Sequence, residues 1–254
     1  MTGGIVAGRR AVLEAIRSGH VVEVMVARGA KDTQGLREVR AAARAAAVPV
    51  RATDRHDLDR LAEEHRGVVA RTASGRAGRR DLGERDLATE AWPADALVVV
   101  LDGITDPQNL GAAARAAEAG GAAALVTRTR RAADVTPSAV RASAGALLHL
   151  PHARVANIAR AVARLQEGGF TAVGLDGSAP RSIFEEACPD GRLALVVGSE
   201  GTGMSRLVRE TCDLLIALPI HGRVGSLNAA TALAAALYGF VLPGRLVAPE
   251  ETRR

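Results

Sequence analysis

The sequence has few cysteines and no long apolar run. Its 254 residues include only Cys188 and Cys212, which lie too far from any pair of histidines to form a zinc site. We find no stretch long enough to cross a membrane, and we expect no signal peptide. These absences exclude disulfide-stapled secreted scaffolds and metal-binding modules. They favour a cytoplasmic protein with no membrane or metal partner, in which both cysteines are small core residues.

Aromatic residues and lysine are equally scarce. The chain is 48% hydrophobic but has one Trp, one Tyr and three Phe, so its cores have to be built from Ala, Val, Leu and Ile. RNA bases would therefore find few rings to stack on. Lys31 is the only lysine among 33 basic residues, and the net charge is +5. Arginine suits phosphate and RNA, but a GC-rich genome produces the same Ala- and Arg-rich composition, so both explanations stay open.

Positive charge is concentrated in the first third of the chain. Residues 1–90 hold 17 basic and 13 acidic side chains, whereas residues 91–254 hold 16 and 15. The densest basic stretch contains Arg66, Arg71, Arg76, Arg79, Arg80 and Arg85. This distribution predicts that contacts with a phosphate-bearing partner would come mainly from the N-terminal part.

The N-terminal part alternates between helical and extended patterns, which predicts a small α/β domain over residues 1–73. The expected helices cover residues 11–19, 36–47 and 58–65, and the expected strands cover residues 21–27, 48–52 and 67–72. Residues 74–93 are rich in Gly and charge and lack a hydrophobic period, so we expect a linker that is basic at its start. This linker would act either as a solvated hinge or as a phosphate contact.

From residue 96 onward the pattern changes to buried strands. Continuous apolar runs separated by helical stretches predict an α/β domain, residues 94–254, with a parallel sheet covered on both faces. The expected strands are residues 97–102, 123–127, 171–176, 193–198 and 214–220. No GxGxxG pattern follows the first of them, which disfavours an ordinary Rossmann arrangement.

Three segments of this second domain place a Gly-rich turn or a polar cap beside an apolar helix. They are residues 109–121, 196–208 and 218–238. Three such turns can converge on one pocket while their helices pack behind it. In the first segment Asn109 starts a helix, and Gly111 and Arg115 share one face, with open space expected above the glycine for a phosphate or sugar. The alternative is an N-cap at Asn109 and an Arg115–Glu118 surface pair.

The second and third segments carry the remaining candidates. Glycines 198, 201 and 203 permit close backbone approach, and Glu200 either faces the pocket or caps the following helix. Ser226 is a candidate N-cap, and Asn228 stands beside it at the start of the last helix. We interpret His149 and His221 as structural residues, since neither has an evident carboxylate partner in sequence.

Taken in this order, NLGAAARAAEAGG, VVGSEGTGMSRLV and LPIHGRVGSLNAATALAAALY resemble the SpoU (TrmH) branch of the SPOUT methyltransferases. The resemblance implies methyl transfer from S-adenosylmethionine to a ribose 2'-hydroxyl in RNA, a deep trefoil knot near the C-terminus, and a homodimer paired through the knotted domains. GRRAVLEAI (8–16) and HRGVVAR (65–71) also resemble the ribosomal-protein-like RNA-binding domain of this family.

The resemblance also assigns roles to individual residues. Asn109 and Arg115 match the family's asparagine and catalytic arginine, and Glu200, Ser226 and Asn228 match its other site positions. The implied contacts to S-adenosylmethionine are Gly198, Gly201, Leu218, Ile220, Leu227 and Asn228, chiefly through the backbone. Ala229 and Ala230 depart from the family pattern and remove one hydroxyl. The identity of the general base stays open, because arginine is a poor base in water.

The N-terminal domain makes the chain look like the 23S rRNA guanosine 2'-O-methyltransferases. The alternatives are a tRNA guanosine or an antibiotic-resistance rRNA adenosine methyltransferase. A different class of protein, an RNA-binding ribosome-assembly factor with a dead site, would predict erosion of the five motif residues. All five are present in this sequence.

Overall fold

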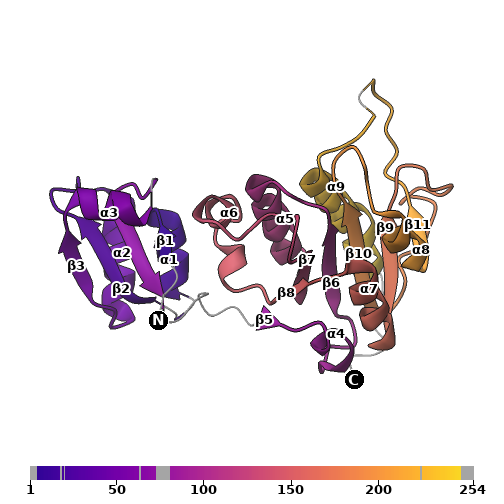
Figure 1. The fold of residues 1–254 in the computed structure, drawn as a ribbon, viewed down its shortest axis with the longest axis horizontal. Coiled ribbons are helices and arrows are strands. Elements are labelled where there is room, and N and C mark those ends of the chain that lie inside the picture. Colours follow the sequence, from indigo (N-terminus) through magenta and orange to yellow (C-terminus); the bar gives the residue numbers. More distant parts are fainter. Residues whose placement is uncertain are drawn as a thin grey trace. The chain divides into compact units, whose positions relative to one another are not determined.

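The chain folds into two compact units in a computed structural model (Figure 1). The structure describes residues 5–17, 19, 21–62, 64–72, 81–223 and 225–246. Unit 1 comprises Met1–Arg80 and Val135–His149, and unit 2 comprises Asp81–Asp134 and Leu150–Arg254. Within the described ranges no helix is both long enough and apolar enough to cross a membrane.

Unit 1 is built on a four-stranded sheet in the order β1-β4-β2-β3. Its strands are β1 (Ile5–Ala7), β2 (Val21–Ala27), β3 (Val50–Thr53) and β4 (Val68–Thr72), and its helices include α1 (Arg9–Arg17), α2 (Gln34–Ala45) and α3 (Arg55–Leu61). β4 pairs antiparallel with β1 and β2, while β2 and β3 are parallel. Leu58 of α3 packs with Met25 and Val69 on one face of the sheet. The small α/β domain expected from the sequence is present, with β1 as an additional strand.

A second stretch of chain, residues 135–149, groups with unit 1 rather than with the strands on either side of it. It contains α6 (Pro137–Ala142) and a 3₁₀ turn (Ala146–Leu148). α6 contacts α1 and β1, and Arg141 donates to Glu64 at 2.6 Å. The domain boundary predicted at residue 94 placed residues 135–149 in the second domain. Nothing in the sequence pattern of this stretch indicates that it packs against the N-terminal residues.

Unit 2 is built on a seven-stranded parallel sheet in the order β11-β9-β10-β6-β7-β8-β5. The strands are β5 (Asp81–Leu82), β6 (Leu97–Asp102), β7 (Ala124–Arg128), β8 (His152–Val155), β9 (Phe170–Leu175), β10 (Arg192–Gly198) and β11 (Leu214–Ile216). β6 and β10 are buried along their whole length or nearly so, as the apolar runs predicted. The sequence did not reveal β8, in which His152 and Arg154 interrupt the apolar pattern.

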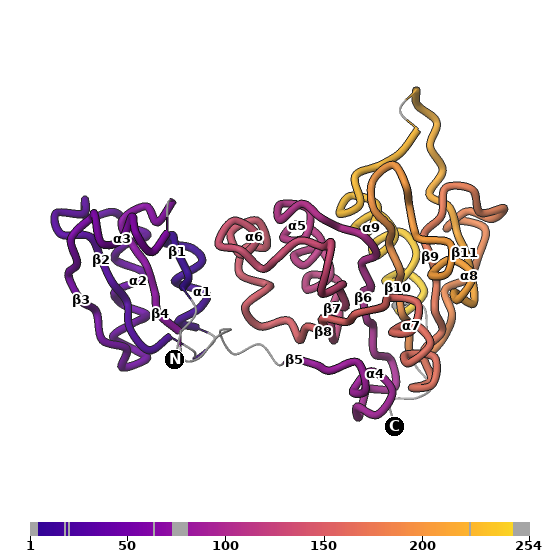
Figure 2. Tube along the Cα trace, in the orientation of Figure 1, coloured from indigo at the N-terminus to yellow at the C-terminus, as the bar shows by residue number. Residues whose placement is uncertain are grey.

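Helices cover both faces of this sheet. They are α4 (Asp86–Thr89), α5 (Pro107–Ala119), α7 (Ile158–Glu167), α8 (Arg206–Thr211), α9 (Ala229–Ala236), a π-helical turn (Leu237–Val241) and α10 (Leu242–Leu246). α5 packs against α9, and α7 packs against α4 and α8. The Cα trace in Figure 2 shows α9 beside β10, although many residues separate them in the chain. The doubly covered parallel α/β fold is therefore confirmed.

We expected a linker over residues 74–93, but its second half, residues 81–93, packs within unit 2. Residues 74–80 lie outside the described residues. Leu82, Leu87 and Trp92 are buried in unit 2. The Trp92 ring lies edge-on to Phe170 at 5.5 Å, and the Arg192 guanidinium donates to the Trp92 carbonyl at 2.7 Å. Three apolar residues spaced five apart match neither the helical nor the strand period, so the sequence pattern concealed this packing.

Candidate active site

The carboxyl ends of β6, β9 and β10 meet at one edge of the unit 2 sheet, where two cavities lie side by side. The larger has a volume of about 330 Å³ and includes Leu175, Gly198, Leu218 and Leu227 in its walls. The smaller has a volume of about 210 Å³ and is lined by the chain from Gly103 to Asp106 and by Asn109. Ser199 and Glu200 line both. Crevices at the carboxyl ends of parallel strands are the usual ligand sites of such sheets.

A cluster of three polar side chains joins the three motif segments. Asn109 Nδ2 donates to Glu200 Oε1 at 2.8 Å, and Asn228 Nδ2 donates to the same oxygen at 2.5 Å. Asn228 Nδ2 also lies 2.9 Å from Asn109 Oδ1. Each residue comes from a different segment, as the sequence predicted when it placed the three turns around one pocket. Two amide donors on one carboxylate oxygen fix its position while leaving the second oxygen open to solvent and ligand.

Helix capping explains why these side chains are available. The N-cap of α5 is Asp106, which accepts from the Gln108 backbone N–H at 3.0 Å. Asn109 therefore lies inside the first turn, and its side-chain amide is not needed for capping. The N-cap interpretation of Asn109 is therefore wrong. The interpretation of Ser226 as a cap is also wrong, because Asn228 caps α9 through Oδ1 and keeps Nδ2 for the cluster. Glu200 caps no helix: α8 begins after Ser205.

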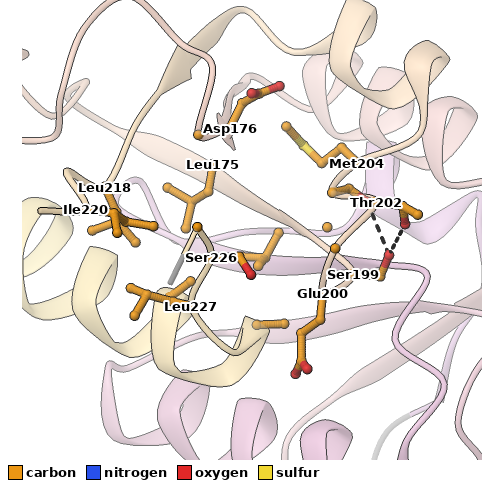
Figure 3. Close-up of a pocket in the computed structure, with 18 of the residues that line it drawn as sticks. Leu175, Asp176, Ser199, Glu200, Thr202, Met204, Leu218, Ile220, Ser226 and Leu227 are labelled. Carbon is orange, nitrogen blue, oxygen red and sulfur yellow. Dashed lines mark hydrogen bonds between the residues drawn. The ribbon is translucent and has the colours of Figure 1, made fainter. Parts of the chain in front are cut away.

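The turn after β10 is closed tightly on itself. Ser199 N donates to Gly203 O at 3.1 Å, and Gly203 N donates back at 2.9 Å. A Cβ on Gly198 would lie 2.1 Å from the backbone of Gly203 and Met204, a distance no side chain can adopt. Gly201 and Gly203 both have positive φ. Glycine is thus required at 198. The turn presents Glu200 at the wall of the larger cavity (Figure 3), and Glu200 also lines the smaller one.

Asp102, at the end of β6, anchors the far side of the same turn. Asp102 is only 3% exposed. Its carboxylate accepts from the Ser205 backbone N–H at 2.7 Å and from Arg128 at 3.2 Å. Asp102 was not among the residues expected at the site, although a carboxylate that ends a fully apolar strand was a usable signal. A buried carboxylate persists only with partners of this kind, so Asp102 ties the Glu200 turn to the sheet.

The larger cavity has apolar walls and main-chain donors. In Figure 3, Leu218, Ile220 and Leu227 lie on one side and Thr202 and Met204 lie across from them. Within the described part of the chain, no group accepts from the backbone N–H groups of Leu218, Ile220 or Leu227. Apolar walls with free main-chain donors suit a flat heteroaromatic ring that carries acceptor nitrogens.

Asp176, at the end of β9, lines the upper part of this cavity in Figure 3. Its carboxylate accepts from the Ser178 backbone and hydroxyl at 2.8 and 2.7 Å and pairs with Arg209 at 2.9 Å. Burial alone would raise the pKa of Asp176, but the bonds from Ser178 and the charge of Arg209 more than offset it, so its pKa lies below the ordinary value. The carboxylate is therefore charged at neutral pH.

The structure does not bring every candidate into the cluster. Ser226 and Gly201 line the larger cavity, but Arg115 lines neither cavity and lies exposed on α5, about 9 Å along the helix axis from Asn109. No ion pair or hydrogen bond links Arg115 to a residue in the described ranges, so the expected Arg115–Glu118 pair is absent there. Gly111 is buried rather than open, because α5 packs closely against α9.

The remaining candidates lie apart from the cluster. His221 is exposed in the loop before α9 and lines neither cavity, and His149 belongs to unit 1. Burial raises the pKa of Cys188, and burial together with Asp213 and Asp102 raises the pKa of Cys212 to about 12. Both thiols are thus protonated at neutral pH. The core positions expected for them are only partly realised, because both residues are half-buried, although Cys212 packs against the unit 2 core. No cluster of metal-ligating side chains occurs among the described residues.

Comparison with known proteins identifies the family. Residues 96–238 match the SpoU rRNA Methylase family, and residues 5–76 match the family described as RNA 2'-O ribose methyltransferase substrate binding. The chain belongs to the SpoU family. It is 37% identical over 235 residues to the putative TrmH family tRNA/rRNA methyltransferase YacO of Bacillus subtilis, covering 92% of this chain and 93% of the relative.

Two further relatives are informative. The chain is 39% identical over 193 residues to the 23S rRNA (guanosine-2'-O-)-methyltransferase RlmB of Pseudomonas putida, covering 75% of this chain and 76% of that protein. The SpoU methyltransferase AviRb from Streptomyces viridochromogenes, solved in complex with AdoMet, superposes with a TM-score of 0.78 at 28% identity, covering 98% of this chain and 92% of the other. This SpoU protein is therefore an RNA 2'-O-methyltransferase that uses S-adenosylmethionine.

The larger cavity fits this cofactor. Its apolar walls and the free N–H groups of Leu218, Ile220 and Leu227 match an adenine ring, whose nitrogens accept hydrogen bonds. The charged Asp176 carboxylate offers an acceptor for ribose hydroxyls or an ammonium group. When bound, S-adenosylmethionine supplies an activated methyl group on a positively charged sulfur.

Proposed function

We propose that this SpoU protein methylates the ribose 2'-hydroxyl of a guanosine in 23S rRNA. The observation that carries the proposal is the Asn109–Glu200–Asn228 cluster, whose Glu200 lines both of two adjacent cavities. The choice of 23S rRNA guanosine is supported by the similarity to the Pseudomonas putida enzyme and by the substrate-binding match over residues 5–76.

In this proposal the smaller cavity receives the target nucleotide and the larger one holds the methyl donor. Asn109 and Asn228 hold one oxygen of Glu200, and the free oxygen accepts from a substrate hydroxyl. Ser226 borders the methyl-donor cavity, and the backbone around Gly198, Gly201, Leu218, Ile220 and Leu227 holds the donor.

Arg115 is proposed to act on the substrate rather than on the protein. Its guanidinium has no partner in the described chain and can hold the phosphate beside the target ribose. There it stabilises the negative charge that develops on the 2'-oxygen as the methyl group is transferred. The hydroxyl proton passes to the phosphate or to water, because guanidinium stays protonated.

We also propose that the protein is a cytoplasmic homodimer. In α9 and the π-helical turn that follows it, Leu233 and Leu237 are buried inside unit 2. Tyr238, in the same turn, is 57% exposed. Its exposure supports a contact with a second copy.

The experiment that tests the substrate is a map of 2'-O-methylated positions. Ribosomal and transfer RNA lacking the modification would be incubated with the purified protein and S-adenosylmethionine, and methylated riboses would be located by resistance to alkaline cleavage. The proposal predicts one new cleavage-resistant position at a guanosine of 23S rRNA. Methylation confined to tRNA, or to an adenosine, would replace the 23S guanosine assignment.

A further inference from the structure

Unit 1 carries a surface groove beside β3, the strand at one edge of its sheet. This α2–β3 groove has a volume of about 550 Å³. Its apolar lining includes Val48, Val50 and Ala52, and its basic lining is Arg28, Arg40 and Arg44. β3 lies at the end of the strand order and is exposed at three of its four residues. The fold itself therefore leaves this strand uncovered, and Val50 is 43% exposed.

Of the three arginines that line the groove, one has an acidic partner among the described residues and two do not. Arg28 lies 3.6 Å from Asp54, whereas the side chains of Arg40 and Arg44 form no ion pair or hydrogen bond with any described residue. They stand four apart on α2, so the two guanidinium groups lie on one helical face and repel each other. Arg37, on the same helix, instead pairs with Asp32 at 3.1 Å. An anion bound between Arg40 and Arg44 would relieve their repulsion.

We propose that the α2–β3 groove holds a nucleotide from a single-stranded segment of the RNA substrate. Arg40 and Arg44 bind its phosphates, and the base lies on the aliphatic floor formed by Val50 and Ala52. Guanidinium planes and aliphatic side chains take the place of aromatic rings, of which the whole chain has five. Single-stranded RNA fits better than a duplex, because an unpaired base can enter a hollow and a stacked one cannot.

This inference rests on RNA being the substrate and not on which nucleotide is methylated. The groove assignment can therefore fail while the 23S guanosine assignment stands, and the 23S guanosine assignment can fail while the groove assignment stands. The double variant Arg40→Ala/Arg44→Ala removes both phosphate contacts and leaves good helix formers in α2. Arg37→Ala on the same helix is the matched control, since its guanidinium does not line the groove.

The measurement is the affinity for a short fluorescein-labelled single-stranded oligoribonucleotide at several salt concentrations. Two lost phosphate contacts make the negative slope of log K against log salt shallower by about 1.4 and weaken binding roughly twenty-fold at about 0.1 M salt. Arg37→Ala should bind within about twofold of wild type. S-adenosylmethionine affinity, measured by calorimetry, should stay unchanged in all variants and shows that unit 2 is intact.

A second variant separates base binding from charge. Ala52→Leu fills the floor of the groove without altering charge, so it should weaken RNA binding several-fold and leave the salt slope unchanged. Oligonucleotides carrying 4-thiouridine should crosslink to peptides of α2 or β3. Wild-type affinity and slope in the double variant would overturn the proposal. The proposal would also be overturned if the double variant kept its affinity for RNA but lost binding to another protein. That result would make the groove a protein-docking surface.

Discussion

Replacing Asp102 tests how the Glu200 turn is held. Asp102→Ala removes the acceptor of the Ser205 N–H at 2.7 Å and the partner of Arg128 at 3.2 Å. Losing one partner of a buried ion pair costs about 3 to 5 kcal/mol. Arg128 has a side chain that is 32% exposed, so water recovers part of this loss. We expect unfolding in urea to show a loss of about 2 to 3 kcal/mol.

The same substitution should also affect the site itself. The turn from Ser199 to Ser205 loses its anchor to β6, so Glu200 is held less firmly and the larger cavity becomes wider. S-adenosylmethionine affinity should fall about tenfold, as measured by calorimetry on the folded variant. Arg128→Ala is the control, because it leaves the Ser205 bond and should affect the cofactor less. If Asp102→Ala lost less than about 0.5 kcal/mol and bound the cofactor normally, the anchoring role would be refuted.

Three further predictions concern single residues. Arg115→Ala should reduce single-turnover methyl transfer about a hundredfold with little change in S-adenosylmethionine affinity, and Arg115→Lys should not restore it; wild-type rates in Arg115→Ala would remove the catalytic role. Gly198→Ala should destabilise unit 2 by about 2 kcal/mol or more, because its Cβ would meet the Gly203 backbone at 2.1 Å; an unchanged urea midpoint would contradict this packing. In a Cys188→Ser background, Cys212 should not react with Ellman's reagent at pH 8 unless the protein is unfolded, because its folded pKa is about 12; rapid labelling of the native protein would show that the thiol is accessible and ionised.

Much of the fold followed from the sequence because unit 2 uses strands buried on both faces. Runs such as residues 97–102 and 193–198 are apolar throughout, and this pattern has few interpretations besides a covered parallel sheet. β8 and the packing of residues 81–93 did not follow, since His152 interrupts one pattern and Leu82, Leu87 and Trp92 have no regular period. The trefoil knot stays a prediction that rests on the family resemblance.

The candidate site was predictable in its membership more than in its geometry. The sequence placed Asn109, Glu200 and Asn228 at one pocket, and their hydrogen bonds join all three segments. It could not assign the caps, because Asp106 and Asn109 are both good N-cap residues and only the backbone decides between them. Asp102 was missed for a related reason: its partners, Arg128 and Ser205, are distant in sequence.

The most direct test of the account is single-turnover methyl transfer by Glu200→Gln. Glutamine keeps an oxygen where Asn109 and Asn228 donate, but it removes the negative charge that borders both cavities. We predict a folded protein that binds S-adenosylmethionine within a few-fold of wild type and transfers the methyl group to the ribose about a hundredfold more slowly. Transfer at the wild-type rate would contradict the claim that this cluster is the catalytic centre.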